Sequence, residues 1–190
     1  MKDLRIKKLP YDFVIMSTIG DGSCFLHSVL LAFNSEYRKE NNAKRKKIVY
    51  KLRKDLSNVL IEKEDDKSYY QNLSRGEIED ISKALPDLQI NNMKKYLNSH
   101  QWLNIYYLEL ISNQLNIDIL IYNQRSKKFY ITGDEEIYHK GRNTVIINYI
   151  EDCHFETIGV KMESGIKTFF TPDCEIIENI KKEYYRHSSP

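Results

Sequence analysis

The chain has 190 residues, 41% of them hydrophobic, so it is long enough to bury one sizeable core. Its 29 basic and 27 acidic side chains leave a net charge of only +2. Nucleic acids and anionic membranes favour strongly basic surfaces, so this balance argues against both and favours a folded protein partner. The three cysteines form no CxxC pair and no disulfide framework, which favours a reducing compartment.

No segment reads as a domain boundary or as a membrane span. Charged residues occur throughout the first eight positions, and no apolar run approaches the roughly 18 residues of a transmembrane helix. Glycine and proline are thinly scattered, and the chain has no internal repeat or low-complexity linker. We therefore expect one domain over residues 1–190, a monomer located in the cytoplasm.

The first third of the chain predicts a turn followed by two helices. A short apolar run at residues 14–16 leads into residues 19–23, which contain two glycines and can turn sharply. Apolar residues then recur at helical spacing, which predicts a buried helix over residues 24–33. A second helix is predicted over residues 43–61, with an apolar stripe formed by Ile48, Val49, Leu52, Leu56, Val59 and Leu60.

The remainder predicts a helical arm and then a sheet. Residues 62–100 are polar and weakly periodic, with one short helix over residues 74–85 that Pro86 ends. A largely apolar helix over residues 102–115 should lead into a central strand at residues 117–122. Further strands are predicted over residues 128–132, 144–150 and 154–160. The fold class is therefore α+β, a small sheet flanked by helices.

Cys24 is placed where a cysteine can be a nucleophile. It follows Asp21-Gly22-Ser23 and opens a helix, where unpaired N–H groups and the helix dipole favour the thiolate. The backbone amides of Asp21, Gly22, Ser23 and Cys24 could also hold a developing oxyanion. The alternative is an unreactive cysteine that packs as a small apolar residue, and it stays open on this evidence alone.

His154 is the best candidate for a general base among the five histidines. It alone lies in a strand pattern directly after an acidic turn, Glu151-Asp152. Side chains alternate along a strand, so His154 and Glu156 should share a face, where the carboxylate could orient the imidazole. A structural histidine in a half-buried strand is the alternative.

Three separate segments resemble the ovarian-tumour (OTU) family of cysteine proteases. The segment Gly20-Asp21-Gly22-Ser23-Cys24-Phe25-Leu26-His27-Ser28 resembles its nucleophile motif, Asp-Gly-x-Cys-aromatic. Residues 101–122 are similar to its tryptophan-led helix and central strand, and residues 153–158 to its histidine strand. The resemblance covers about residues 13–160 and implies a papain-like OTU fold, with residues 161–190 as a C-terminal extension that we expect to be helical.

The resemblance implies a thiol-dependent deubiquitinase with Cys24 as nucleophile, His154 as general base and Asp21 as the aspartate that shapes the turn. Glu156 takes the orienting position, where the family more usually has Asp or Asn, so Asp21 could share or replace that role. The implied partners are ubiquitin, polyubiquitin chains or ubiquitin-like modifiers, gripped by residues 36–100, and no cofactor is implied. A catalytically weak or inactive ubiquitin-binding module of the same fold is the alternative. Family habit and an AT-rich composition suggest a large DNA virus or an intracellular bacterium as the source.

Several other features are assigned structural roles. The basic run at residues 44–47 reads as a solvated helix face and not as a nucleic-acid site. His27, Cys153 and Cys174 read as structural residues. A zinc site needs four ligands at set spacing, and the sequence has no such cluster, so we expect no metal.

Overall fold

The computed structural model describes residues 1–60, 90–103, 107–131, 141–150 and 154–186. Its helices are α1 (Cys24–Phe33), α2 (Ser35–Lys39), α3 (Asn42–Val59), α6 (Ile90–Leu97), α7 (Leu108–Leu115) and α9 (Glu175–Arg186). Its strands are β1 (Lys2–Leu4), β2 (Phe13–Met16), β3 (Ile117–Asn123), β4 (Lys128–Ile131), β5 (Asn143–Ile150), β6 (His154–Met162), β7 (Gly165–Lys167) and β8 (Phe169–Phe170).

The strands form one mixed sheet in the order β1-β2-β6-β5-β3-β4. β3 and β5 run parallel, and the other neighbours along this order are antiparallel. β3 is buried at every position from Ile117 to Tyr122, as expected for a strand covered on both faces. β6 lies between β2 and β5, so the first and last thirds of the chain meet in the middle of the sheet.

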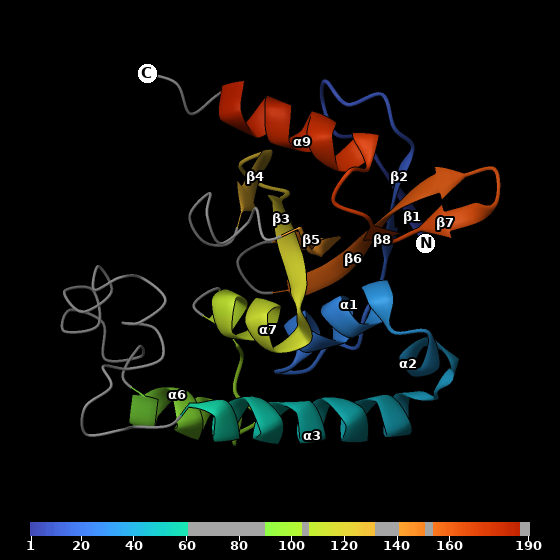
Figure 1. Cartoon of the computed structure of the whole chain (residues 1–190). Helices are drawn as coiled ribbons and strands as arrows, with labels where there is room; N and C mark the ends of the chain where they lie inside the picture. The colour runs from blue at the N-terminus through green and yellow to red at the C-terminus, as the bar shows by residue number, and fades with distance from the viewer. Residues whose placement is uncertain (61–89, 104–106, 132–140, 151–153, 187–190) are drawn as a thin grey trace.

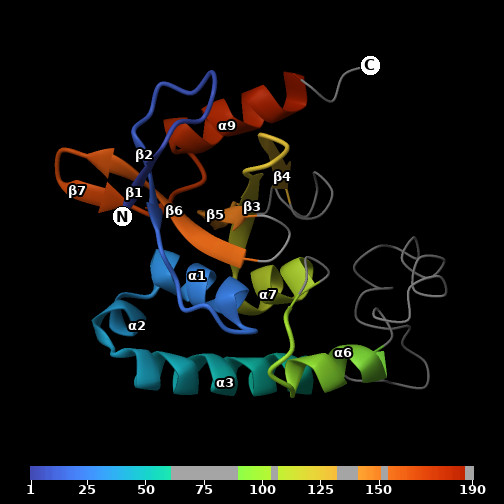
Figure 2. The ribbon, with the colours of Figure 1, turned by 180° about the vertical axis from the view of Figure 1, so that it is seen from behind.

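Helices cover both faces of the sheet (Figure 1). α1 and α7 lie against one face, and α3 and α6 form a further layer beyond them. α9 covers the opposite face, which Figure 2 shows from behind. Two apolar clusters match these layers: one joins α1, α3, α6 and α7 to the sheet, and the other joins α9 to its far side. The fold is thus α+β, a sheet flanked by helices, as the sequence predicts.

The helix that carries Cys24 has the predicted bounds, residues 24–33. Nine of its ten residues are buried, including His27 and Ser28, because the sheet lies on one side and other helices on the other. α3 ends two residues before the predicted limit of residue 61. Its predicted stripe is buried at Val49, Leu56 and Leu60, but the assignment of Ile48 was wrong because this side chain is 36% exposed.

The predicted helix over residues 102–115 is shorter than expected. Within the described residues it begins at Leu108, and Trp102 lies outside it with 55% of its surface exposed. The predicted helix at residues 74–85 falls outside the described part of the chain, as do most of residues 62–100. Beyond residue 160, β6 continues to Met162, and β7 and β8 precede α9.

None of the described helices combines the length and apolar character that crossing a lipid bilayer would need.

Candidate active site

Cys24 begins α1 directly after a tight turn that the side chain of Asp21 holds together. The backbone N–H of Ser23 donates to Asp21 Oδ1 at 2.8 Å, and the N–H of Cys24 donates to the Asp21 carbonyl at 3.1 Å. Ser23 is the N-cap residue, but its side chain does not cap the helix. Asp21 therefore fixes this turn, because its carboxylate and its carbonyl each accept a hydrogen bond from the backbone that follows it.

The Cys24 thiol is inside the protein, with the residue only 3% exposed. Burial raises the pKa of this thiol, and the negative charge of Asp21 adds to the increase. Backbone hydrogen bonds involving Phe155, Phe25 and Cys24 itself act in the opposite direction. The sequence predicts that the helix start favours the thiolate. The backbone hydrogen bonds do lower the thiol pKa, but desolvation raises it by more.

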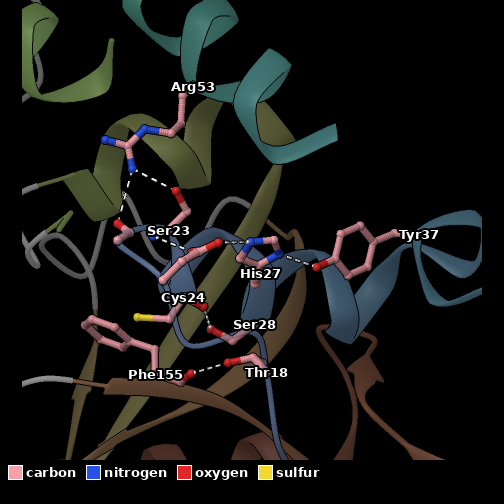
Figure 3. Close-up of polar contacts among 10 residues, drawn as sticks. Thr18, Ser23, Cys24, His27, Ser28, Tyr37, Arg53 and Phe155 are labelled. Atoms are coloured by element: carbon pink, nitrogen blue, oxygen red, sulfur yellow. Dashed lines mark hydrogen bonds and ion pairs between the residues drawn. The ribbon is translucent and has the colours of Figure 1, made fainter. Parts of the chain in front are cut away.

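Several contacts attach the start of β6 to α1 and to the segment that precedes it. Thr18 Oγ1 donates to the Phe155 carbonyl at 2.6 Å, and Thr157 Oγ1 donates to the Ser28 carbonyl at 2.7 Å. The rings of Phe25 and Phe155 pack with centroids 4.9 Å apart. Figure 3 shows the Cys24 sulfur on the side of α1 that faces Phe155. His154 precedes Phe155 in the chain, so its backbone lies beside Cys24.

His154 is half-buried and is the first residue of β6, as predicted. Alternation along the strand directs Phe155 and Thr157 toward α1, whereas His154 and Glu156 belong to the other set. Glu156 is half-buried and is paired in register with Asn148 of β5. Within the described residues, no hydrogen bond or ion pair joins His154 to Cys24, Asp21 or Glu156. The structure thus brings the elements together without a closed hydrogen-bonded triad, a geometry that unliganded enzymes often show.

His27 links the turn at residues 21–24 to α2. Its Nε2 lies 3.2 Å from Asp21 Oδ2, and its Nδ1 is hydrogen-bonded to the Tyr37 hydroxyl. Burial raises the pKa of Tyr37 to about 12, so the phenol stays protonated and donates to Nδ1. A carboxylate cannot donate, so Nε2 carries the imidazole proton and donates to Asp21. The structural role expected of His27 is therefore specific: this chain of contacts holds the second oxygen of Asp21.

The backbone amides of the turn differ in whether they are already used. The N–H groups of Asp21, Ser23 and Cys24 donate within the turn or to Ile19. The Gly22 N–H has no partner in the described part of the chain. The Asp21–Gly22 peptide is planar, so fixing the Asp21 carbonyl also fixes the direction of this N–H. Among the four amides predicted as oxyanion donors, Gly22 is the one left available.

Gly22 also has no room for a side chain. A Cβ built at this position would lie 1.9 Å from the backbone oxygen of His100, whereas a Cβ at Gly20 would have no atom within 4 Å. The turn at residues 21–24 therefore packs directly on the backbone of residues 100–101. A matched pair of substitutions can test how much this contact matters.

We expect Gly22→Ala to lower the free energy of unfolding by about 1–3 kcal/mol, because a backbone oxygen must move to admit the methyl group. Gly20→Ala, two residues earlier, should change it by less than about 0.5 kcal/mol. Urea denaturation of both variants measures this difference. Equal effects at the two positions would contradict the proposed packing of the turn.

Arg53 is a site residue that the sequence analysis missed. It is 1% exposed and donates to the Gly22 carbonyl at 3.2 Å and to Ser23 Oγ at 2.9 Å, as Figure 3 shows. A signal was present in the sequence, because Arg53 follows Val49 by four residues and precedes Leu56 by three. It therefore lies on the apolar face of its helix, and this position predicts a buried side chain and not a solvated one.

The remaining candidates lie away from this turn or have other partners. Cys174 is half-buried, with its sulfur 3.7 Å from Lys167 Nζ, and Cys153 falls outside the described residues. In the basic run, Lys44 pairs with Glu40 at 3.0 Å, and the Arg45 guanidinium lies 5.1 Å from the Tyr37 ring centre. No group of three or more His, Cys, Asp or Glu side chains in the described residues could hold a metal ion.

Burial lowers the pKa of His27, so its imidazole resists protonation in the folded state more than in the unfolded state. Below the ordinary pKa of about 6.5, the unfolded chain gains a proton that the folded one does not take up. Stability should therefore fall as the pH decreases from 7 toward 5. We expect His27→Gln to be less stable at pH 7 and to lose less on acidification, in urea titrations across this range. If the free energy of unfolding falls equally with pH in the wild type and in His27→Gln, His27 is not the group responsible for this loss of stability.

Comparison with known proteins gives one family match. The model of the OTU-like cysteine proteases matches residues 19–155, which include the turn, α1 and the start of β6. No curated protein matches the chain significantly.

Solved structures support the same fold. An ovarian-tumour domain in complex with ubiquitin aligns with a TM-score of 0.60 at 15% identity, covering 95% of this chain and 87% of that one. The viral OTU protease of Taggert virus gives 0.53 at 11% identity, covering 86% and 87%. The Hazara virus OTU bound to ubiquitin gives 0.50 at 13% identity, covering 83% and 86%. Together with the family match across most of the sequence, this shows that the chain belongs to the OTU-like cysteine proteases.

Proposed function

We propose that this protein is a deubiquitinase that hydrolyses the isopeptide bond after the C-terminus of ubiquitin or a ubiquitin-like modifier. The observation that carries the proposal is the position of Cys24, at the start of a buried helix and beside the strand that begins with His154. Family membership supports cysteine-protease chemistry. Two of the similar solved structures are complexes with ubiquitin, which supports ubiquitin as the partner.

In the proposed reaction, Cys24 Sγ attacks the isopeptide carbonyl after His154 has accepted the thiol proton. The C–N bond breaks, His154 returns the proton to the leaving lysine amine, and ubiquitin is left as a thioester on Cys24. A water molecule activated by His154 then hydrolyses the thioester and frees the thiol. No cofactor takes part in these steps.

The raised pKa of Cys24 makes the base essential in this scheme. A thiol that burial keeps protonated is a weak nucleophile at neutral pH, so its proton must be removed as substrate binds. The Gly22 N–H is our candidate for binding the developing oxyanion, because the other amides of the turn already have acceptors.

We assign binding of the ubiquitin fold to residues 36–100. Two large apolar side chains of α3 are exposed on this arm, Ile48 at 36% and Tyr50 at 42%, and such side chains are suited to contact with a folded protein. The small net charge of the chain also fits a protein partner.

Cys24→Ala should abolish cleavage of diubiquitin, because the thiol forms the covalent intermediate. It should leave the fold and the affinity for ubiquitin nearly unchanged. A ubiquitin probe with a C-terminal alkyne tests the same point by covalent capture, which should occur in the wild type and be lost in this variant. Cleavage assays on a panel of diubiquitins, one for each linkage, would then show which linkages the enzyme hydrolyses.

Cys153→Ala and Cys174→Ala serve as controls and should keep substantial activity. Loss of activity in either one to the level of Cys24→Ala would place the nucleophile elsewhere, and near wild-type turnover by Cys24→Ala would refute the proposal.

A ubiquitin-binding module without catalysis is the second candidate. The absence of a hydrogen bond between His154 and either Cys24 or Glu156 in the described residues favours it. Such a module would bind ubiquitin tightly and would not react with the alkyne probe, so the capture experiment separates the two functions.

We further propose that Glu156 orients His154. Glu156→Gln should lower kcat partially while leaving binding nearly intact, and His154→Ala should be close to inactive. Asp21→Asn is the comparison, because Asp21 contacts Ser23 and His27 and should act through the turn. Measurements of kcat between about pH 6 and 9 test this. If Glu156→Gln matches the wild type throughout while Asp21→Asn is severely impaired, Glu156 has no orienting role.

A further inference from the structure

Arg53 has an environment that a purely solvated or ion-paired arginine would not have. Its guanidinium donates five hydrogen bonds and thereby uses all five of its N–H groups. The acceptors are the carbonyls of Gly22, Tyr96, Leu97 and Gln101 and the hydroxyl of Ser23. No carboxylate in the described part of the chain forms an ion pair with it. The direct partners of this buried cation are thus four backbone carbonyls and one hydroxyl, and the negative charge of Asp21 favours the cation without a direct contact.

These acceptors come from two segments that are far apart in the sequence, residues 22–23 and residues 96–101. Nη1 binds the catalytic turn at Gly22 and Ser23, at 3.2 and 2.9 Å. Nε binds the Leu97 carbonyl at 2.9 Å, at the end of α6, where the helix dipole favours a positive charge. Nη2 reaches the Gln101 carbonyl at 3.0 Å. One side chain of α3 thus connects the arm formed by α3 and α6 to the residues just before Cys24.

The bond to Gly22 also constrains the next amide. The Gly22–Ser23 peptide is planar, so holding its carbonyl from one side fixes its N–H, which donates to Asp21 Oδ1 on the other. Arg53 and Asp21 therefore hold the same peptide group from opposite ends. The packing of Gly22 against the His100 oxygen adds a third restraint on this turn.

We propose that Arg53 is a positioning residue for the reaction at Cys24, and that it couples the placement of the α3–α6 arm to the geometry of the catalytic turn. This inference rests on the proposed function for its effect on turnover. Arg53 touches no reacting atom. It acts by holding the backbone from Gly22 to Cys24 in one conformation. The α3–α6 arm and the turn then move together when a substrate binds to the arm.

The main test replaces Arg53 with lysine, which keeps the charge but has only three N–H donors on one atom and cannot bind all five acceptors of residues 22–23 and 96–101. We expect kcat for a ubiquitin substrate to fall about 10- to 100-fold, as for a small misplacement of a reacting group, with KM changed by less than about threefold. Two-dimensional NMR of the amides of Gly22, Ser23 and Cys24 should show displaced resonances even without substrate.

Thr168→Val is the matched control. Thr168 lies outside residues 36–100, is buried, and its Oγ1 donates to the Ala32 carbonyl at 2.6 Å, near the other end of α1. This variant should lose thermal stability while keeping the kcat of the wild type per folded molecule. If it lowers kcat as much as Arg53→Lys does, the effect is general destabilisation and the inference is wrong.

Ser23→Ala covers the case in which Arg53→Lys does not fold, because it removes only one of the five acceptors. It should shift the Gly22 amide resonance and lower kcat by a smaller factor. Wild-type kcat together with unshifted amides in Ser23→Ala or in folded Arg53→Lys would overturn the proposal.

The NMR measurement also separates this inference from the proposed function. If the wild type cleaves no ubiquitin substrate, the function fails, while the amide shifts still decide whether Arg53 sets the turn.

Discussion

The burial of α1 on every side is the constraint on which the site depends. An amphipathic surface helix would leave its first turn in water, but nine of the ten residues of α1 are buried between the sheet and the outer helices. The orphan N–H groups at its start and the polar side chains within it therefore need partners inside the protein. The contacts around Cys24 can be understood as answers to that need.

Three sets of polar side chains supply hydrogen bonds around this turn, each from a different direction. The Asp21 carboxylate accepts from the Ser23 N–H, the His27 and Tyr37 pair holds the second oxygen of Asp21, and the buried Arg53 donates to the Gly22 carbonyl. Removal of one partner would leave the others buried and unsatisfied, which costs more than the single bond is worth. The same burial raises the pKa of Cys24, so the arrangement that makes the turn rigid also keeps the resting thiol protonated.

Much of this architecture could be predicted from the sequence because its signals are local. The glycine-containing turn and the apolar spacing after it locate α1 at its observed residues, and the alternation after residue 154 locates β6. The balance between desolvation and helix dipole at Cys24 could not be predicted, because it depends on what packs above the thiol. Arg53 was missed since its neighbours Lys51 and Lys54 look the same in sequence, although only Arg53 is turned inward.

The position of β6 has a consequence for the order in which the molecule is made. Among the strands that the structure describes, β1 and β2 join the rest of the sheet through β6, and the Cys24 thiol has Phe155 beside it only once β6 is present. Contacts that span more than a hundred residues, such as Thr18 with Phe155, form late and slow the folding of a domain. Most of the chain must therefore be synthesised before β6 can pack beside Cys24. Nascent or truncated products that end before residue 154 carry the cysteine without the strand that packs beside it.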